Sequence, residues 1–137
     1  MITRDLKKKL LLIAKKMPVI ALTGPRQSGK TTLLKAAFPN YDYVNLEHPP
    51  TRTLALSDPD QFLSQYSKGL IIDGVQRAPE LFSYLQVVID KQKKMAHYIL
   101  SGSQNFSLLE NISQSLAGRV ALFNLLPFSF SICSFWK

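Results

Sequence analysis

Short apolar runs along the chain alternate with segments in which apolar residues recur every three or four positions. The short runs are bounded by Gly, Pro, Asp or Asn, which predicts buried β-strands. The amphipathic segments predict helices that pack one face against these strands. Strands are expected over residues 19–23, 41–46, 69–73, 97–102 and 119–125. Helices are expected over residues 5–16, 30–38, 58–66, 79–89 and 107–116.

Strands that alternate with helices predict an α/β fold, in which a parallel sheet is covered by helices on both faces. A chain of 137 residues can bury a sizeable core, so we expect a single domain over residues 1–137. The lone Cys133 cannot form an internal disulfide. No apolar run is as long as a membrane span, and the N-terminus lacks a signal-peptide cleavage site. We therefore expect a cytoplasmic protein without a membrane span.

The formal net charge of +8 is unevenly distributed along the chain. Residues 1–40 carry nine Lys and Arg residues against Asp5 alone, whereas residues 41–90 are acidic overall. A basic N-terminal segment can attract nucleic acid or anionic lipid. The alternative is a solvated helix face whose apolar residues Leu6, Leu10 and Ile13 turn inward, and charge runs more often have this meaning.

The segment "GPRQSGKT", residues 24–31, matches the phosphate-binding pattern G-x-x-x-x-G-K-[ST]. It follows a predicted strand and begins a predicted helix, which is the context that the motif requires. Its glycines let backbone N–H groups surround a phosphate at the helix N-terminus. Lys30 is expected to bind the β- and γ-phosphates, and the Thr31 hydroxyl to ligate Mg²⁺. The predicted nucleotide-binding residues are Gly24, Pro25, Arg26, Gln27, Ser28, Gly29, Lys30, Thr31 and Thr32.

Asp73 lies at the carboxyl end of the third predicted strand, where open α/β sheets place ligand-binding groups. A carboxylate at this place can hold the Mg²⁺ shell through water, together with Thr31. The alternative is an Asp that caps the turn after the strand. Because the phosphate-binding loop and this Asp occur together, we favour a role in binding the metal.

A series of segments resembles the prokaryotic AAA-type ATPases that carry a further C-terminal domain. The segments are "VIALTGPRQSGKTTLLKAAFP", "YVNLE", "DPDQFL", "IIDGVQRAPELFSYLQVVID", "YILSGSQNF" and "SQSLAGRVALFNLLPFS", and together they span about residues 2–131. The resemblance implies an AAA+ P-loop fold with a five-stranded parallel sheet in the order 5-1-4-3-2. It also implies Mg-ATP as ligand, ATP hydrolysis as activity, and a homo-oligomer or a protein partner.

The sequence departs from this family in two places. The family usually has D-E-[IV]-Q where this chain has Asp73, Gly74, Val75 and Gln76. The family also continues well beyond "LLPFS", so we expect this chain to be a truncated form. Without a glutamate at position 74 the water-activating carboxylate is missing, so we expect Mg-ATP binding with weak hydrolysis. The alternatives are an active ATPase that uses another base, and a nucleotide-regulated DNA-binding module that uses the basic N-terminal segment.

Gly74 has a second interpretation, because a residue without Cβ can serve a backbone turn with positive φ. Two other residues lie near enough in the motif or strand pattern to be weighed against a missing base. Gln76 is neutral and can orient water but cannot accept its proton. Glu47 ends the second strand, which the implied order places at the sheet edge, about three spacings of ~4.8 Å from the loop strand. We therefore do not expect Glu47 to serve as the base.

Polar residues beyond the fourth strand complete the predicted site. By resemblance, Ser103 or Gln104 is expected to sense the γ-phosphate or to position water, and the alternative is a turn stabilised by their hydrogen bonds. Arg119 could be a sensor or an arginine finger, because its guanidinium binds phosphate oxygens, or it could form an ion pair. Arg26 and Arg77 could face nucleotide or a neighbouring subunit.

Overall fold

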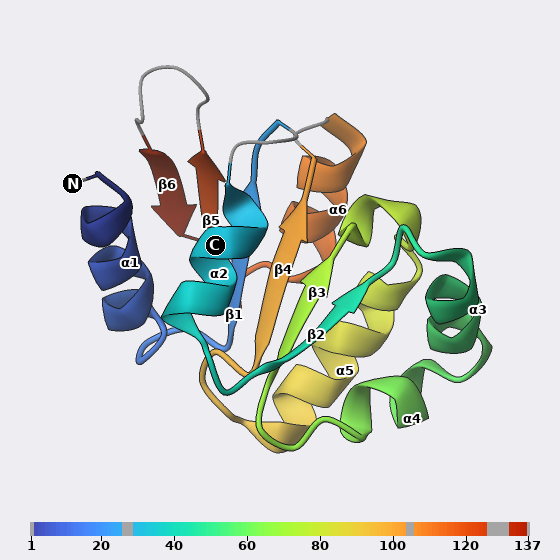
Figure 1. Cartoon of the computed structure of the whole chain (residues 1–137). Helices are drawn as coiled ribbons and strands as arrows, with labels where there is room; N and C mark the ends of the chain where they lie inside the picture. Colours follow the sequence, from blue (N-terminus) through green and yellow to red (C-terminus); the bar gives the residue numbers. More distant parts are fainter. Residues whose placement is uncertain (1, 26–28, 104–105, 126–131, 137) are drawn as a thin grey trace.

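The computed structural model describes residues 2–25, 29–103, 106–125 and 132–136, which form one sheet with helices around it (Figure 1). The strands are β1 (Val19–Thr23), β2 (Asp42–Asn45), β3 (Leu70–Asp73), β4 (Tyr98–Gly102), β5 (Val120–Leu125) and β6 (Ile132–Trp136). The helices are α1 (Ile2–Ile13), α2 (Lys30–Ala37), α3 (Pro49–Ser57), α4 (Pro59–Ser64), α5 (Leu81–Gln92) and α6 (Phe106–Ser115), with the 3₁₀ turn η1 (Val75–Arg77) after β3.

The sheet has the strand order β2-β3-β4-β1-β5-β6. Its first five strands pair in parallel, which confirms the expected order 5-1-4-3-2. The sixth strand, β6, was not predicted. It runs antiparallel to β5, with Leu125 opposite Ile132 and Ala121 opposite Trp136. Its sequence is rich in aromatic and β-branched residues, which favour strands, and it pairs with an edge of β5 that the five-stranded order leaves unpaired.

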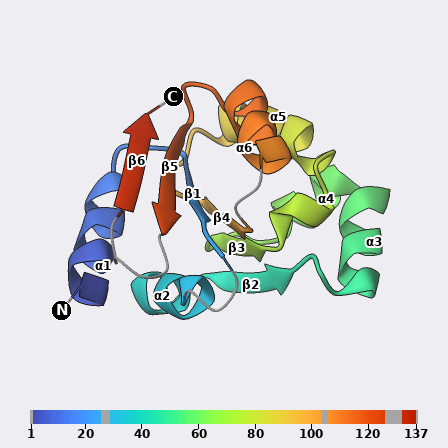
Figure 2. The ribbon, with the colours of Figure 1, turned by 90° about the horizontal axis from the view of Figure 1, so that it is seen from above.

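Alternate residues of each strand supply two apolar layers, one on each face of the sheet. Val19 and Ala21 of β1 pack with residues from α3, α4, α5 and α6, whereas Ile20 and Leu22 pack with residues from α1 and α2. Figure 2 shows α1 and α2 on one side of the sheet and α5 and α6 on the other. The prediction of helices on both faces is therefore confirmed.

The basic N-terminal helix follows the amphipathic pattern. Leu6 and Leu10 are fully buried and Ile13 is half-buried against the same layer. Lysines at positions 8, 9, 15 and 16 are exposed. The inward position of the apolar stripe agrees with the solvated-face interpretation. Nucleic-acid binding by the exposed lysines stays a prediction.

The helices differ from the predicted ones at several places, whereas one predicted cap is found. Helix α3 was missed, because its sequence begins with Pro49 and Pro50, which are tolerated in the first turn of a helix but read as a loop. Asp58 caps α4 as expected, since its carboxylate accepts a hydrogen bond from the backbone N–H of Gln61 at 3.3 Å. Helix α5 begins at Leu81, two residues after Pro79.

The parallel register brings four strand ends to one edge of the sheet. Thr23 of β1 lies opposite Gly102 of β4, and Asp73 of β3 lies between Ser101 of β4 and Asn45 of β2. The segments that follow these strands therefore meet at the carboxyl edge, where α/β folds bind ligands.

Candidate functional site

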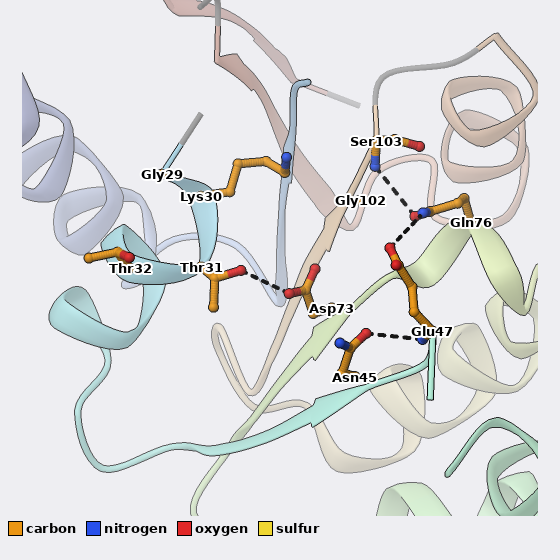
Figure 3. Close-up of a pocket in the computed structure, with 10 residues that line it drawn as sticks. All are labelled: Gly29, Lys30, Thr31, Thr32, Asn45, Glu47, Asp73, Gln76, Gly102 and Ser103. Carbon is orange, nitrogen blue, oxygen red and sulfur yellow. Dashed lines mark hydrogen bonds between the residues drawn. The ribbon is translucent and has the colours of Figure 1, made fainter. Parts of the chain in front are cut away.

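A cavity of about 340 Å³ opens at this carboxyl edge (Figure 3). Small-molecule sites in proteins commonly have volumes of ~300–1,000 Å³. The cavity is lined by residues from the start of α2 and from the ends of β2, β3 and β4: Gly29, Lys30, Thr31, Thr32, Asn45, Glu47, Asp73, Gln76, Gly102 and Ser103. Six of the predicted site residues are therefore brought together: Gly29, Lys30, Thr31, Thr32, Asp73 and Ser103.

Lys30 is the buried cation of the cavity. Its Nζ donates hydrogen bonds to the carbonyl oxygens of Gly24, at 2.9 Å, and Pro25, at 2.8 Å. The ammonium group is thus held beside the loop that follows β1, at the N-terminus of α2. The backbone of Gly29, with a φ of 84°, turns the chain into that helix. A helix N-terminus and a buried ammonium group together favour an anionic ligand.

Thr31 and Asp73, 42 residues apart in sequence, are in direct contact. The Thr31 hydroxyl donates to Oδ2 of Asp73 at 2.8 Å. The same carboxylate oxygen accepts a hydrogen bond from the Tyr43 hydroxyl at 2.7 Å, and Oδ1 accepts one from the backbone N–H of Gly74 at 2.9 Å. A hydroxyl and a carboxylate in contact are oxygen ligands of the kind that Mg²⁺ prefers.

Tyr43 is a site residue that the sequence analysis missed. Burial, together with its hydrogen bond to the Asp73 carboxylate, raises the pKa of the Tyr43 phenol above its ordinary value. The phenol therefore stays protonated and remains a donor to Asp73. The signal was available in the sequence, since the implied strand order places β2 beside β3 and alternation puts Tyr43 and Asn45 on one face.

Gly74 adopts a left-handed backbone conformation, with a φ of 70° and a ψ of 32°, and begins η1. A Cβ at this position would lie 2.9 Å from Cγ of Glu47, and 3.1 Å from both Oδ1 of Asn45 and the backbone nitrogen of Glu47. A side chain at position 74 would therefore be strained and crowded in this conformation. This geometry favours the interpretation that the turn requires glycine.

Glu47 lies closer to the predicted site than the strand spacings suggested. Strand β2 is the edge strand, as expected, but Glu47 lines the same cavity as Lys30 and Asp73. The backbone N–H of Leu46 donates to the carbonyl of Asp73 at 2.9 Å, so pairing with β3 continues one residue beyond β2. Glu47 follows directly and comes to lie beside Gly74. Strand spacings alone do not give the position of Glu47, because the turn after β2 places this residue beside Gly74.

Gln76 links Glu47 to the end of β4. Its Oε1 accepts a hydrogen bond from the backbone N–H of Ser103 at 3.3 Å, and its Nε2 donates to Oε1 of Glu47 at 3.5 Å (Figure 3). The absence of a side chain at Gly102 permits this approach, because a Cβ there would lie 2.7 Å from Oε1 of Gln76. Ser103 thus lies at the cavity, and its role as a sensor stays a prediction.

Arg119 is not brought to the cavity. Its carbonyl oxygen accepts a hydrogen bond from the backbone N–H of Val19, at the amino end of β1 and hence at the opposite edge of the sheet. Its guanidinium forms a two-point ion pair with Asp90, with N–O distances of 2.7 and 2.8 Å, and the hydrogen bond from Arg119 lowers the pKa of that carboxyl group. The ion-pair alternative is the one that this geometry supports within the chain.

The remaining predicted residues divide into three groups. Gly24 and Pro25 form the start of the loop, and the backbone N–H of Gly24 donates to the carbonyl of Gly102 at 3.3 Å. Arg77 is exposed on η1 and lines a neighbouring cavity with Phe82. Four predicted residues lie outside the described residues: Arg26, Gln27, Ser28 and Gln104.

The strand order, the Gly-Lys-Thr loop after β1 and the Asp at the end of β3 define a P-loop domain of the AAA+ kind. A family model described as an AAA domain (AAA_14) matches residues 16–133. The chain therefore belongs to this AAA domain family, and its resemblance to AAA-type ATPases is confirmed.

Two relatives are proteins of mycobacteria, the uncharacterised proteins Mb2031c of Mycobacterium bovis and Rv2008c of Mycobacterium tuberculosis. Each is 37% identical to the chain over 123 residues. The match covers 89% of this chain but 28% of each relative, so the chain spans little more than a quarter of their length.

Two solved structures share the fold. A DNA replication initiation factor superimposes with a TM-score of 0.54 at 15% identity, over 88% of this chain and 44% of that one. AMPPCP-bound DnaA from Aquifex aeolicus gives a TM-score of 0.55 at 16% identity, over 86% of this chain and 44% of that one. At such low sequence identity, these similarities show a shared fold and nothing about function. Among the described residues, no helix is long and apolar enough to cross a membrane.

Proposed function

We propose that this AAA domain binds Mg-ATP in the cavity at the carboxyl edge of the sheet and hydrolyses it slowly. The observation that carries the proposal is the hydrogen bond of 2.8 Å between Thr31 and Asp73, in a cavity that also contains Lys30. It joins the two halves of a Mg-nucleotide site that lie 42 residues apart in the sequence. Membership in an AAA family supports a nucleotide as the ligand.

The phosphate groups and the Mg²⁺ ion of Mg-ATP each have suitable partners among the described residues. Lys30 would meet the β- and γ-phosphate oxygens with its ammonium group, exchanging its two carbonyl partners for phosphate. Thr31 and Asp73 would hold Mg²⁺, which neutralises negative charge on the phosphates. Among the described residues no three His, Cys, Asp or Glu side chains are grouped to hold a metal ion. Phosphate and water oxygens would therefore supply the other Mg²⁺ ligands, as is usual for this ion.

We infer slow hydrolysis because position 74 lacks a carboxylate that could act as a general base. A general base commonly contributes roughly 10²–10⁴-fold to a rate. Gly74 carries no carboxylate, and its left-handed backbone leaves no space for one in this conformation. Any base must therefore act from another position, less directly than a carboxylate at position 74 would, so hydrolysis is expected to be slow. The residues expected to bind the phosphates, Lys30 and Thr31, do not include Gly74, so binding is expected to be retained.

Thermal unfolding with and without Mg-ATP tests the proposal. A ligand that binds only the folded state stabilises it by RT ln(1 + [L]/Kd), which is ~2.7 kcal/mol at a hundredfold excess over Kd. The wild-type domain should therefore melt at a higher temperature in millimolar Mg-ATP. Lys30→Ala should lose this shift, because the variant lacks the cation for the phosphates.

The matched control is Lys91→Ala, which removes an exposed lysine on α5, outside the cavity. It should retain the full shift. An unchanged melting temperature of the folded wild-type domain in millimolar Mg-ATP would refute the proposal, and so would an equal shift in Lys30→Ala.

A further inference from the structure

We propose that Glu47 is the general base for the attacking water, in the place of the glutamate that position 74 lacks. This inference rests on the Mg-ATP site proposed above and assigns a catalytic role to a residue of the turn after β2. It is carried by three observations: the space that Glu47 occupies, the contacts that hold it there, and the carboxylates that line the cavity.

The first observation concerns space. A Cβ built at Gly74 would lie 2.9 Å from Cγ of Glu47, closer than two such carbons approach in proteins. The Glu47 side chain therefore occupies the volume in which a side chain at position 74 would begin. A side chain at position 74 would require the Glu47 side chain to shift, so the glycine leaves room for Glu47 beside the cavity in this conformation.

The second observation concerns positioning. The Asn45 side chain accepts a hydrogen bond from the backbone N–H of Glu47 at 3.0 Å, which fixes the turn after β2. The amide of Gln76 faces the carboxylate across 3.5 Å, a long hydrogen bond. Its oxygen accepts from the Ser103 N–H, which directs its NH₂ group toward Glu47. Figure 3 shows the Glu47 carboxylate directed toward Gln76 and into the cavity, with Asp73 between it and Thr31.

The third observation concerns charge. Asp73 and Glu47 are the two carboxylates among the described residues that line this cavity. Asp73 accepts three hydrogen bonds, from Thr31, Tyr43 and the Gly74 N–H, and these contacts suit a carboxylate beside a metal ion. Proton acceptance therefore falls to Glu47.

The reaction step balances with the groups named. A water molecule forms a bond to the γ-phosphorus and gives a proton to the Glu47 carboxylate. The bond between the γ-phosphorus and the β–γ bridging oxygen breaks, and its electron pair leaves with ADP. The products are ADP and inorganic phosphate, and Glu47 then releases its proton to solvent. Lys30 would stabilise the negative charge on the phosphate oxygens throughout.

Glu47→Gln tests the inference, because the amide keeps the size and the polar contacts of the side chain but cannot accept the proton. The turnover of ATP is measured under single-turnover conditions with labelled ATP, and the Kd of Mg-ATP is measured in parallel by calorimetric titration. The variant should lose at least about tenfold in turnover, the low end for a general base. Its Kd should change by less than about threefold, and a non-hydrolysable ATP analogue should raise its melting temperature as much as it does for wild type.

Glu80→Gln is the matched control, since Glu80 is exposed and lies outside the cavity, and it should match wild type in both measurements. Equal turnover of Glu47→Gln and wild type would overturn the inference while leaving Mg-ATP binding intact. A Kd that weakens as much as turnover falls would also overturn it, because Glu47 would then be a binding residue. A wild-type domain that binds Mg-ATP without any turnover would overturn the inference alone, whereas one that does not bind Mg-ATP would refute the proposed function itself.

Discussion

Replacing Gly74 by alanine should lower the free energy of unfolding by about 2–3 kcal/mol, although it adds a single methyl group. The left-handed backbone, with a φ of 70°, costs an L-residue about 1–2 kcal/mol. The new Cβ would also lie 2.9 Å from Cγ of Glu47 and 3.1 Å from its backbone nitrogen. The side chain of Glu47 can shift, but its backbone is held by the pairing of Leu46 with β3, so part of the crowding remains.

Urea denaturation measures this change. With a dependence of roughly 2 kcal/mol per molar urea, the midpoint should fall by about 1 M or slightly more. Gly29→Ala is the matched control, because Gly29 has a φ of 84° but its Cβ would meet nothing within 4 Å. That variant should lose only the conformational part, about 1–2 kcal/mol. The difference between the two variants isolates the crowding against Glu47.

Gly74→Glu distinguishes the two interpretations of this glycine. Because the turn demands positive φ and Glu47 occupies the adjacent space, the variant should be destabilised at least as much as Gly74→Ala and should not gain hydrolysis. A Gly74→Glu protein that is as stable as wild type and hydrolyses ATP about tenfold faster would refute this reasoning. If Gly74→Ala lowered the free energy of unfolding by less than about 0.5 kcal/mol, the predicted loss of stability would be refuted.

Two further predictions concern single side chains. Tyr43→Phe removes the hydroxyl that donates to Asp73 at 2.7 Å and should lower the free energy of unfolding by roughly 1 kcal/mol. This is less than the loss of a fully buried hydrogen bond to a charged group, because the site is partly exposed. Urea denaturation of the variant measures this loss of stability, and an unchanged midpoint would contradict the prediction. Burial lowers the pKa of His97 below its ordinary value of 6.5, with Lys94 adding to this effect and the Tyr66 carbonyl opposing it. The unfolded chain therefore takes up the proton first as the pH falls, and stability should be lost below about pH 6.5. His97→Gln, which can still donate to the Tyr66 carbonyl, should show a weaker decline between pH 7.5 and 5.5, and parallel curves for the two proteins would contradict the assignment.

The alternation of apolar runs and amphipathic segments was sufficient to predict the parallel core of the fold. The strands β1, β3, β4 and β5 are short, mainly apolar and almost entirely buried, which leaves little ambiguity, whereas β2 is partly exposed. Helix α3 was missed because its two initial prolines are also typical of loops. Strand β6 was missed because it pairs with an edge that the resemblance did not require, and antiparallel pairing depends on contacts that local sequence does not specify.

The site could be predicted where a motif fixes the local backbone. Lys30 and Thr31 follow from the loop, and Asp73 follows from its place at a strand end. Glu47 could not be placed by counting strands, because its position depends on the turn fixed by Asn45 and on the open space at Gly74. Arg119 shows the reverse case: its type suits phosphate, but the register of β5 puts it at the opposite edge of the sheet.

A crystal structure of the domain with Mg²⁺ and a non-hydrolysable ATP analogue tests the central claim most directly. A phosphate oxygen of the analogue should lie within hydrogen-bond distance of Lys30 Nζ. Mg²⁺ should lie about 2.1 Å from the Thr31 hydroxyl, with Asp73 bound to it through water. The Glu47 carboxylate should lie within about 3.2 Å of the attacking water, or one further water away. A nucleotide bound outside this cavity, or one bound here while Thr31 keeps its hydrogen bond to Asp73 and no metal is present, would contradict the account.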